Sequence, residues 1–404
     1  MNEHLLRFPA HSHSRRSSLR TVLREVVRAG AISRAELSRR TGLSKQTMSD
    51  IVRDLLEEDW LRAVGQQRGA VGRSATNYEL NPSRCHVWGG DLGGTSLRVC
   101  IADFTGRTVA EAREPTEPAG GEAVVNQIVA LVGRLAASRG LPLERIACGA
   151  IGVPGAYDRQ SRRLSLVTNV AGLDRMDLEA VLGARLGMTV FAENDVTLAA
   201  NGELSRGSPW STGTFAFLAM GTGVGLGLVS EGQIVRGARG AAGEIAWLPL
   251  GGDPFDSRNF HAGTLERAIS SVAILERYRA YGGPKDASMI ALFDAYNAGA
   301  PAAARVLDEV ARTLAVVIVA IRALLDPEAV VFGGSIGVRP ELLALVRAQL
   351  ARCMPDPVPV EASRLGGKAA EVGAVAMAIS HVHDLLLSDL PATPEAFDPA
   401  GARD

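Results

Sequence analysis

The chain has 404 residues, of which 47% are hydrophobic and 22% are charged, so it has the composition of a globular protein and is too long for one compact core. Residues 1–82 carry 14 Lys and Arg against 9 Asp and Glu, whereas the remainder of the chain has a net charge of −6. This asymmetry suits an N-terminal domain that contacts phosphates, although a solvated basic surface without a partner would look the same.

The cysteines, the longest apolar run and the N-terminus exclude several classes of protein. Cys85, Cys100, Cys148 and Cys353 have no paired or ligand spacing, so we expect neither a disulfide framework nor a local metal site. The apolar run 314–321 is far shorter than the roughly 20 residues of a bilayer span and predicts a buried helix. No secretion signal is recognised, and the sequence therefore predicts a cytoplasmic protein without a membrane partner.

Residues 1–82 predict a winged helix-turn-helix domain, beginning with two helices. Apolar residues recur at helical spacing over 19–27, which predicts a first helix that ends near Gly30. Ser33 and Glu36 have the spacing of a capping box, in which the serine accepts a backbone amide and the glutamate reaches back. We therefore expect a second helix to begin at Ser33 and to end at the turn 41–43.

A third helix follows and is interpreted as the recognition helix. Ser44 is its expected cap, and its expected inner face is Met48, Ile51, Val52, Leu55 and Leu56. The polar side chains near its N-terminus then face outward, where a recognition helix contacts the major groove. The predicted DNA contacts on this helix are Ser44, Lys45, Gln46, Thr47 and Ser49.

Two short strands are expected to complete this domain as a wing. The stretch from Trp60 to Val64 and the stretch 76–80 are predicted to pair around the Gly- and Arg-rich loop 66–74. Arg68 and Arg73 in this loop are predicted to contact phosphate or a minor groove. The alternative is a structural or protein-binding three-helix module with a solvated loop.

The larger body opens with a meander of strands and a glycine turn. A strand from His86, a second over 97–102 and a third after Gly106 do not have the pattern of a Rossmann unit. Within Asp91-Leu92-Gly93-Gly94-Thr95, two successive glycines allow backbone amides to approach phosphate oxygens, and Asp91 is suited to hold a metal-bound water. Alone, this motif is explained equally well by an ordinary hairpin turn.

Two further glycine loops strengthen the phosphate interpretation. The loop 221–225 lies between strand-like runs 215–219 and 226–229, and Gly333-Gly334-Ser335 follows the apolar run 329–332. Three such loops at strand ends predict two similar lobes around a nucleotide cleft. The predicted nucleotide-binding residues are Asp91, Gly93, Gly94, Thr95, Gly221, Thr222, Gly223, Gly333 and Gly334.

Five segments resemble, in order, the motifs of the ROK family of repressors, open reading frames and sugar kinases. They are 91–98, 152–155, 193–195, 221–227 and 237–244. With the N-terminal domain, the chain is similar to the family's transcriptional-regulator branch, whose members respond to sugars. The resemblance implies an α/β fold, a two-lobed actin-like ATPase of ribonuclease H-like type. The expected domains are 1–82 (winged helix), 83–200 (lobe 1, completed by a C-terminal helix 370–388), 201–369 (lobe 2) and 389–404 (a flexible tail).

The same resemblance implies a sugar site. Asn194 and Asp195 match the family's sugar-binding pair, and Asp195 matches its catalytic base, which accepts the proton of an attacking hydroxyl. The residues carried over as sugar contacts are Gly155, Asn169, Asn194, Asp195, Glu244, Trp247 and Glu266. Glu193 and Glu203 are instead interpreted as surface charges or helix caps.

The chain departs from the family at its structural zinc. The family's ligands, one histidine and three cysteines, are matched here by Trp247, Ser257, Asn259 and Thr264. Zinc requires thiolate or imidazole ligands, and the neighbouring His261 cannot supply them alone. We therefore predict no structural zinc and expect packing to organise 253–261, with Trp247 stacking on a sugar ring or filling the space of the lost histidine.

Two functions follow from these expectations. In the first, the chain is a sugar-responsive regulator, a repressor, that binds operator DNA as a homodimer or a dimer of dimers and requires no cofactor. In the second, it is an ATP-dependent sugar kinase, using ATP with Mg²⁺, that carries an accessory DNA-binding domain. The change at Trp247 favours the regulator, because it alters the side of the site that holds the sugar.

Overall fold

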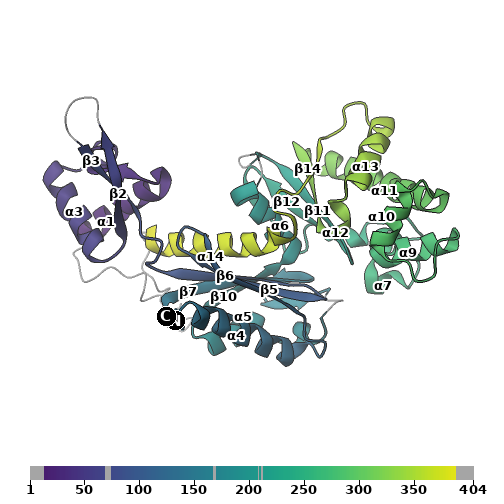
Figure 1. The fold of residues 1–404 in the computed structure, drawn as a ribbon, viewed down its shortest axis with the longest axis horizontal. Coiled ribbons are helices and arrows are strands. Elements are labelled where there is room, and N and C mark those ends of the chain that lie inside the picture. Colours follow the sequence, from purple (N-terminus) through teal and green to yellow (C-terminus); the bar gives the residue numbers. More distant parts are fainter. Residues whose placement is uncertain (1–12, 69–73, 167–169, 208, 211–212, 388–404) are drawn as a thin grey trace, which may run out of the picture.

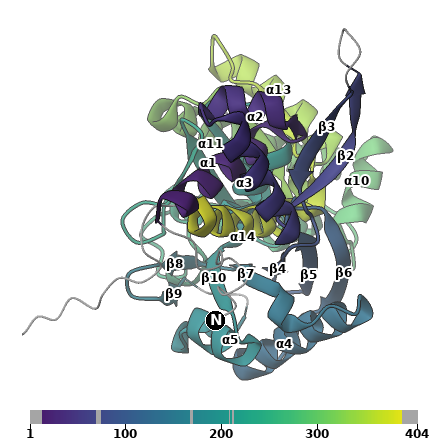
Figure 2. The same ribbon diagram turned by 90° about the vertical axis from the view of Figure 1, so that its left-hand side faces the viewer.

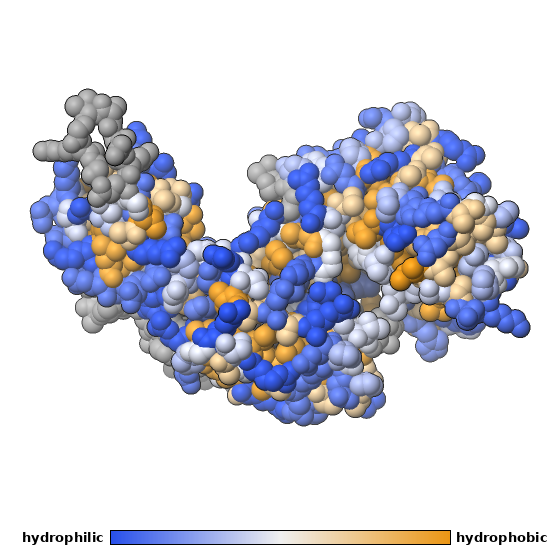
Figure 3. Space-filling model, in the orientation of Figure 1, coloured by the Kyte–Doolittle hydropathy of each residue, from blue (hydrophilic) through white to orange (hydrophobic). Residues whose placement is uncertain are grey.

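The computed structural model describes residues 13–387 except 69–73, 167–169, 208 and 211–212. The chain forms an N-terminal head and a two-lobed α/β body, and the head stands to one side of the body (Figures 1 and 3). The long helix α14 (Ala369–Leu387) runs between them. The α/β class and the two-lobed arrangement agree with the expectation from the sequence.

The head contains three helices and a three-stranded sheet. Its elements are α1 (His13–Ala29), β1 (Ile32–Ser33), α2 (Arg34–Thr41), α3 (Lys45–Glu57), β2 (Leu61–Arg68) and β3 (Ser74–Leu80). β3 lies between β1 and β2 and is antiparallel to both. The core of the head consists of the apolar faces of the three helices and of Trp60, which are fully buried. The strands of the wing are longer than predicted, because pairing continues to Arg68 and Ser74.

The caps of α2 and α3 follow the expected serines, with one correction. Ser33 accepts a hydrogen bond from the Glu36 amide at 3.3 Å. Glu36 does not return a hydrogen bond to Ser33, as a capping box would predict. Its carboxylate instead accepts hydrogen bonds from Arg39 (2.7 and 2.9 Å) and Arg40 (2.7 Å), because two guanidinium groups on the next turn are stronger donors than a backbone amide.

Lobe 1 is a five-stranded sheet covered on both faces. Its elements are β4 (His86–Leu92), β5 (Ser96–Asp103), β6 (Thr108–Pro115), α4 (Gly121–Ser138), β7 (Ile146–Val153), β8 (Ala156–Asp158), β9 (Arg163–Ser165), α5 (Leu178–Leu186), β10 (Thr189–Asn194) and α6 (Asp195–Gly202). The strand order is β10-β7-β4-β5-β6, with β7 parallel to β4 and β10. α4 and α5 cover one face and α14 covers the other (Figure 2).

Lobe 2 repeats this plan with a second five-stranded sheet. Its elements are β11 (Phe215–Met220), β12 (Val224–Ser230), β13 (Gln233–Val235), α7 (Asn259–Ala262), α8 (Thr264–Ile269), α9 (Ser271–Ala280), α10 (Met289–Asn297), α11 (Pro301–Leu325), β14 (Ala329–Gly333), α12 (Gly334–Gly337), α13 (Pro340–Cys353) and β15 (Val360–Ala362). The strand order is β13-β12-β11-β14-β15. The apolar run 314–321 lies within α11 and is largely buried, as expected.

α14 is a core helix that belongs to the body. By length and composition, the segment Gly366–Leu387 could cross a membrane. Here it packs against β4, β7 and α6, and Gly373 allows the close approach to α6, because a Cβ there would lie 1.8 Å from the Leu198 carbonyl oxygen. Its apolar composition is therefore explained by burial between the lobe 1 sheet and α6.

The head contacts the body through aromatic side chains and through hydrogen bonds. Trp60 of the head packs edge to face on Phe104, which packs in the same manner on His383 of α14. The Arg84 guanidinium lies 4.4 Å from the centroid of the Trp60 ring. Arg24 of α1 donates a hydrogen bond to the Leu387 carbonyl at 2.7 Å. The head is thus packed against both lobe 1 and the end of α14.

Candidate functional site

The N-terminus of α3 presents polar side chains at the surface of the head. Lys45 and Gln46 are exposed, and Gln46 donates to the Asp50 carboxylate at 3.3 Å. Ser44 accepts a hydrogen bond from the Thr47 amide at 3.1 Å, and the two hydroxyls lie 2.8 Å apart. Ser49 is half-buried. Lys45 and Gln46 are therefore exposed without a capping role, whereas Ser44, which is also exposed, and Thr47 take part in the cap.

The predicted contacts in the wing are only partly visible. The backbone of Arg68 lies in β2, at the last pair of the hairpin, opposite Ser74. The Arg68 side chain and the whole of Arg73 lie outside the described residues.

A cavity of about 290 Å³ lies between the two lobes of the body. Loops from lobe 1 and lobe 2 meet there, although they are far apart in the sequence. The predicted residues that line it are Gly93, Gly94, Thr95, Gly155, Asn194, Asp195, Gly221, Thr222, Gly223, Glu244, Trp247, Glu266 and Gly334. Asp91 and Gly333 are not among the lining residues, and Asn169 lies outside the described residues.

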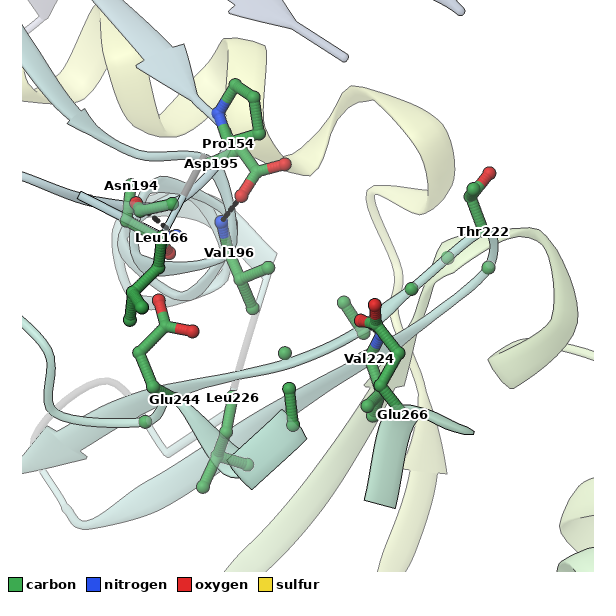
Figure 4. Close-up of a pocket in the computed structure, with 18 of the residues that line it drawn as sticks. Pro154, Leu166, Asn194, Asp195, Val196, Thr222, Val224, Leu226, Glu244 and Glu266 are labelled. Carbon is green, nitrogen blue, oxygen red and sulfur yellow. Dashed lines mark hydrogen bonds between the residues drawn. The ribbon is translucent and has the colours of Figure 1, made fainter. Parts of the chain in front are cut away.

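Asn194 and Asp195 lie where β10 ends and α6 begins. The Asn194 side chain caps α6 by accepting from the Thr197 amide at 2.8 Å, and its amide nitrogen donates to the Gly155 carbonyl at 3.1 Å. Asp195 accepts from the Val196 amide at 2.8 Å (Figure 4). The capping contacts hold Asn194 in place, and Asp195 lines the cavity.

The carboxylates around this cavity have raised pKa values. Burial, and next the charge of Asp91, raise the pKa of Asp195 to about 7, against the lowering effect of the Val196 amide. Burial raises the pKa of Asp91 to about 6, partly offset by Arg98. Burial also raises the pKa values of Glu244 and Glu266. An acid near neutrality at the end of a strand has the protonation behaviour required of a general base.

Glu244 and Glu266 occupy different ends of the cavity. Glu266 accepts a hydrogen bond from the Val224 amide at 3.2 Å and so braces the loop 221–223, whereas Glu244 lies on the side of Asn194 (Figure 4). Gly243 precedes Glu244 with a φ of +90°, and a Cβ there would lie 1.9 Å from the Leu226 carbonyl oxygen. Only glycine permits this close approach, which fixes the position of Glu244.

Glu193 and Glu203, interpreted from the sequence as surface charges or helix caps, are not surface charges, although Glu203 is the C-cap residue of α6. Glu193 is 1% exposed and forms ion pairs with Arg236 of lobe 2 at 2.6 Å and with Arg159 of lobe 1 at 3.1 Å. Glu203 is also buried and accepts hydrogen bonds from the Ser363 hydroxyl (2.5 Å) and from the backbone amide of residue 365 (3.3 Å). Both carboxylates join segments that are distant in the sequence, and this tertiary pairing compensates for their burial.

The segment 253–261 does not fit a zinc ion, and its organisation differs from the expectation. Asn259 is buried, donates to the Asp253 carbonyl at 2.8 Å and accepts from Arg267. Asp256 accepts hydrogen bonds from Arg258. In the part of the chain that the structure describes, no group of three or more His, Cys, Asp or Glu could hold a metal ion. Hydrogen bonds and ion pairs, rather than packing, organise this segment, because its phenylalanines are exposed.

Sequence reasoning missed several residues that line the cavity. Pro154, Leu166 and Val196 line it, and His261, which was considered only as a zinc ligand, also lies there. Leu166 is 43% exposed and has a φ of +59°. The hairpin β8–β9, directly after which Leu166 lies, has no chemical motif, so no sequence signal marked this residue.

Comparison with known proteins agrees with this geometry. A model of the ROK family matches residues 87–381, and a model of the MarR family matches residues 20–70. This chain belongs to the ROK family. It carries an N-terminal winged helix-turn-helix domain, which places it with the family's transcriptional regulators.

Curated relatives include regulators over nearly the whole chain. The chain is 22% identical to the xylose repressor of Caldicellulosiruptor bescii over 89% of this chain and 94% of the relative. It is 23% identical to the DNA-binding transcriptional dual regulator NagC of Escherichia coli over 88% of this chain and 90% of the relative. The chain is 27% identical to a beta-glucoside kinase of Klebsiella pneumoniae, but the alignment covers only 65% of this chain and 85% of the kinase.

Solved structures show the same fold. A ROK family transcriptional regulator, described as a homolog of the E. coli MLC protein, superposes with a TM-score of 0.73 over 93% of this chain and 98% of that chain, at 22% identity. A ROK family glucokinase from Streptomyces griseus, in complex with glucose and AMPPNP, superposes with a TM-score of 0.61 over 72% of this chain and 98% of that chain, at 25% identity. The match to the regulator is therefore long enough to include both head and body. The match to the kinase covers a fraction of the chain about equal to the body alone.

Proposed function

We propose that this chain is a sugar-responsive transcriptional regulator, a repressor, whose cleft between the lobes binds a sugar effector and whose head binds operator DNA. One observation carries the proposal: a winged helix packs directly against the lobe that supplies Asp195 to the cleft. The names of the relatives, which include a xylose repressor, support a sugar as the class of effector.

The cleft is suited to respond to a ligand because both lobes contribute to it. Asp195 and Asn194 come from lobe 1, and Glu244 and Glu266 come from lobe 2. Sugar hydroxyls that bind the polar side chains of both lobes stabilise the closed arrangement over the open one. A ligand shifts such an equilibrium only by its difference in affinity for the two states, typically about 1–3 kcal/mol.

The head transmits this change to DNA. It is fixed to lobe 1 and to α14 through Trp60, Phe104 and His383, so a movement of the lobes moves the recognition helix. A homodimer would read two half-sites, and a change in the separation of its heads would change operator affinity.

The test is an anisotropy titration of a fluorescent operator, selected from a random duplex library with this protein, in the presence and absence of monosaccharides. We expect one sugar to change the DNA dissociation constant by about 5- to 150-fold. DNA affinity that stays the same at saturating concentrations of every sugar that binds would refute the proposal.

A sugar kinase is the second candidate, because the phosphate loops and Asp195 line the same cavity. Gly93, Gly221 and Gly334 would let backbone amides approach the phosphates of ATP, and Asp91 would hold Mg²⁺ through water. ATP bound in this way would supply the phosphoryl group, and Asp195 would accept the proton of the sugar hydroxyl. Asp195→Asn should abolish phosphorylation; sugar-dependent DNA release that persists in this variant would assign the switch to binding and not to chemistry.

A further inference from the structure

A second cavity, of about 490 Å³, adjoins the sugar site and shares part of its wall. Leu166, Trp247 and His261 line both cavities. The outer cavity is completed by Arg163 and Ser165 of the β8–β9 hairpin, by Asp174, and by Phe260 of α7. The inner and outer cavities therefore meet at Trp247 and Leu166.

The inner cavity, which the proposed function assigns to a sugar, is small. Its volume of about 290 Å³ lies just below the range of about 300–1,000 Å³ that small-molecule sites occupy. The glycine loops, including Thr222, take up one end, and Leu166 lies toward the other, beside Asn194 and Glu244 (Figure 4). A sugar ring that presents a hydroxyl to Asp195 thus has its opposite end at the opening into the outer cavity.

The side chains of the outer cavity have the chemistry of a carbohydrate subsite. Phe260 is 79% exposed and Trp247 is 37% exposed, and such aromatic faces pack on the apolar faces of sugar rings. Arg163, Asp174 and Ser165 are exposed polar groups that can exchange hydrogen bonds with ring hydroxyls.

The backbone at the opening is itself unusual. Leu166 is held at a φ of +59°, in the left-handed region that leucine seldom adopts, and its side chain is exposed. Such backbone strain persists where the surroundings impose it, and it occurs frequently at ligand sites. An exposed leucine in this conformation at the junction of two cavities is explained if a ligand packs against it.

We propose that the effector is a disaccharide, whose first ring occupies the inner cavity and whose second ring occupies the outer cavity against Trp247 and Phe260. The inference rests on the proposed function, since the first ring is the sugar bound by Asn194 and Asp195. The outer cavity is lined by lobe 1 through Arg163 and Asp174 and by lobe 2 through Phe260. The second ring therefore contacts both lobes and adds to the preference for the closed arrangement.

The test uses three probes in each of four sugar series, glucose, mannose, xylose and galactose: the free sugar, its methyl glycoside and a disaccharide of the same sugar. Isothermal titration calorimetry gives the affinity of each for the full-length protein. In the series that binds, we expect the disaccharide to bind about tenfold more tightly than the methyl glycoside, which blocks the same hydroxyl without adding a ring. Equal affinities in every series, or no binding in any, would overturn the inference.

Variants test whether the additional affinity for the disaccharide comes from the outer cavity. Phe260→Ala should reduce the preference for the disaccharide to about twofold while leaving methyl glycoside affinity unchanged, and Phe260→Tyr should restore it. Phe255→Ala is the matched control, since Phe255 is 93% exposed and lines neither cavity. Equal losses for both probes in Phe260→Ala would contradict the proposed position of the second ring.

Operator binding measured with the same probes separates the two proposals. A disaccharide that binds tightly without altering DNA affinity would leave the subsite intact and refute the regulator. A monosaccharide that binds as tightly as the disaccharide and releases DNA would leave the regulator intact and refute the subsite.

Discussion

The junction between head and body and the cleft between the lobes both bring distant segments together, but with opposite chemistry. At the junction, Trp60 and Phe104 are buried in aromatic contact. In the cleft, the half-buried Asp195 and Glu244 have carboxylates as neighbours, and their pKa values are raised. Burial stabilises the protein in the first region and disfavours charge in the second.

This difference separates stability from response. The junction is built on aromatic contacts and acts as a fixed connection. The cleft contains carboxylates that repel one another. A ligand whose hydroxyls donate hydrogen bonds to them would reduce this repulsion and so stabilise the cleft on binding. Four sets of variants test this contrast and the recognition helix that responds to it.

The largest effect is expected at the junction. Trp60→Ala removes a fully buried side chain and should lower the free energy of unfolding by about 3–5 kcal/mol. Urea denaturation followed by circular dichroism measures the loss. Trp247→Ala is the control in the cleft, where the half-exposed ring should contribute less than about 1 kcal/mol. Similar losses for both tryptophans would remove the contrast between the two regions.

The next effect is expected at the ion pairs behind the cleft. Glu193→Gln removes the charge that pairs with Arg236 and Arg159 and should cost about 2 kcal/mol of unfolding free energy. Glu114→Gln breaks the exposed pair with Arg134 and should cost less than about 1 kcal/mol. If the Glu193 variant unfolds at the same urea concentration as the wild type, this buried pair does not hold the lobes.

The recognition helix should affect DNA binding without affecting stability. Gln46→Ala should weaken operator binding about tenfold, and Lys45→Ala should lower the slope of log affinity against log salt by about one. Lys285→Ala, an exposed change on lobe 2, is the control. An unaltered dissociation constant in both head variants would favour the interpretation of the head as a protein-binding module.

The smallest effect is the pH dependence of the cleft. Asp195 has a folded pKa of about 7, above the ordinary value of 3.8, so the folded state binds the proton more tightly than the unfolded state. Its contribution to stability is therefore present below pH 4 and is lost as the pH rises to 7. Asp195→Asn should remove this dependence and stabilise the protein at pH 8 by at least about 1 kcal/mol. Urea denaturation at pH 5 and pH 8 measures the change in unfolding free energy with pH. The same change in wild type and variant would contradict the raised pKa.

Much of the head could be predicted from the sequence, because its signals are local. The serine caps at Ser33 and Ser44 and the apolar face of α3 follow from spacing within one or two helical turns. The prediction for Glu36 was wrong because two arginines one turn away compete for its carboxylate. The predicted wing was too short because strand pairing depends on the partner strand as well as on the apolar pattern.

Individual motifs of the cleft could be predicted from the sequence, but their arrangement around the cavity could not. The glycine loops and the pair Asn194-Asp195 were recognised as motifs, and their roles as nucleotide and sugar contacts remain predictions. That Glu193 is buried could not be foreseen, since its partner Arg236 lies on the other lobe. The outer wall formed by Leu166 and Phe260 had no signal, because shape alone places these residues at the site.

The sequence by itself determined the order of the domains, the family and the elements of the head, because helix periods, caps and glycine turns act over a few residues. Only the tertiary structure decided which carboxylates are buried, how far their pKa values rise and which side chains join the two cavities. These properties depend on distances between residues separated by many positions in the chain. The physical reason is that desolvation and ion pairing are properties of the assembled fold, not of any short segment.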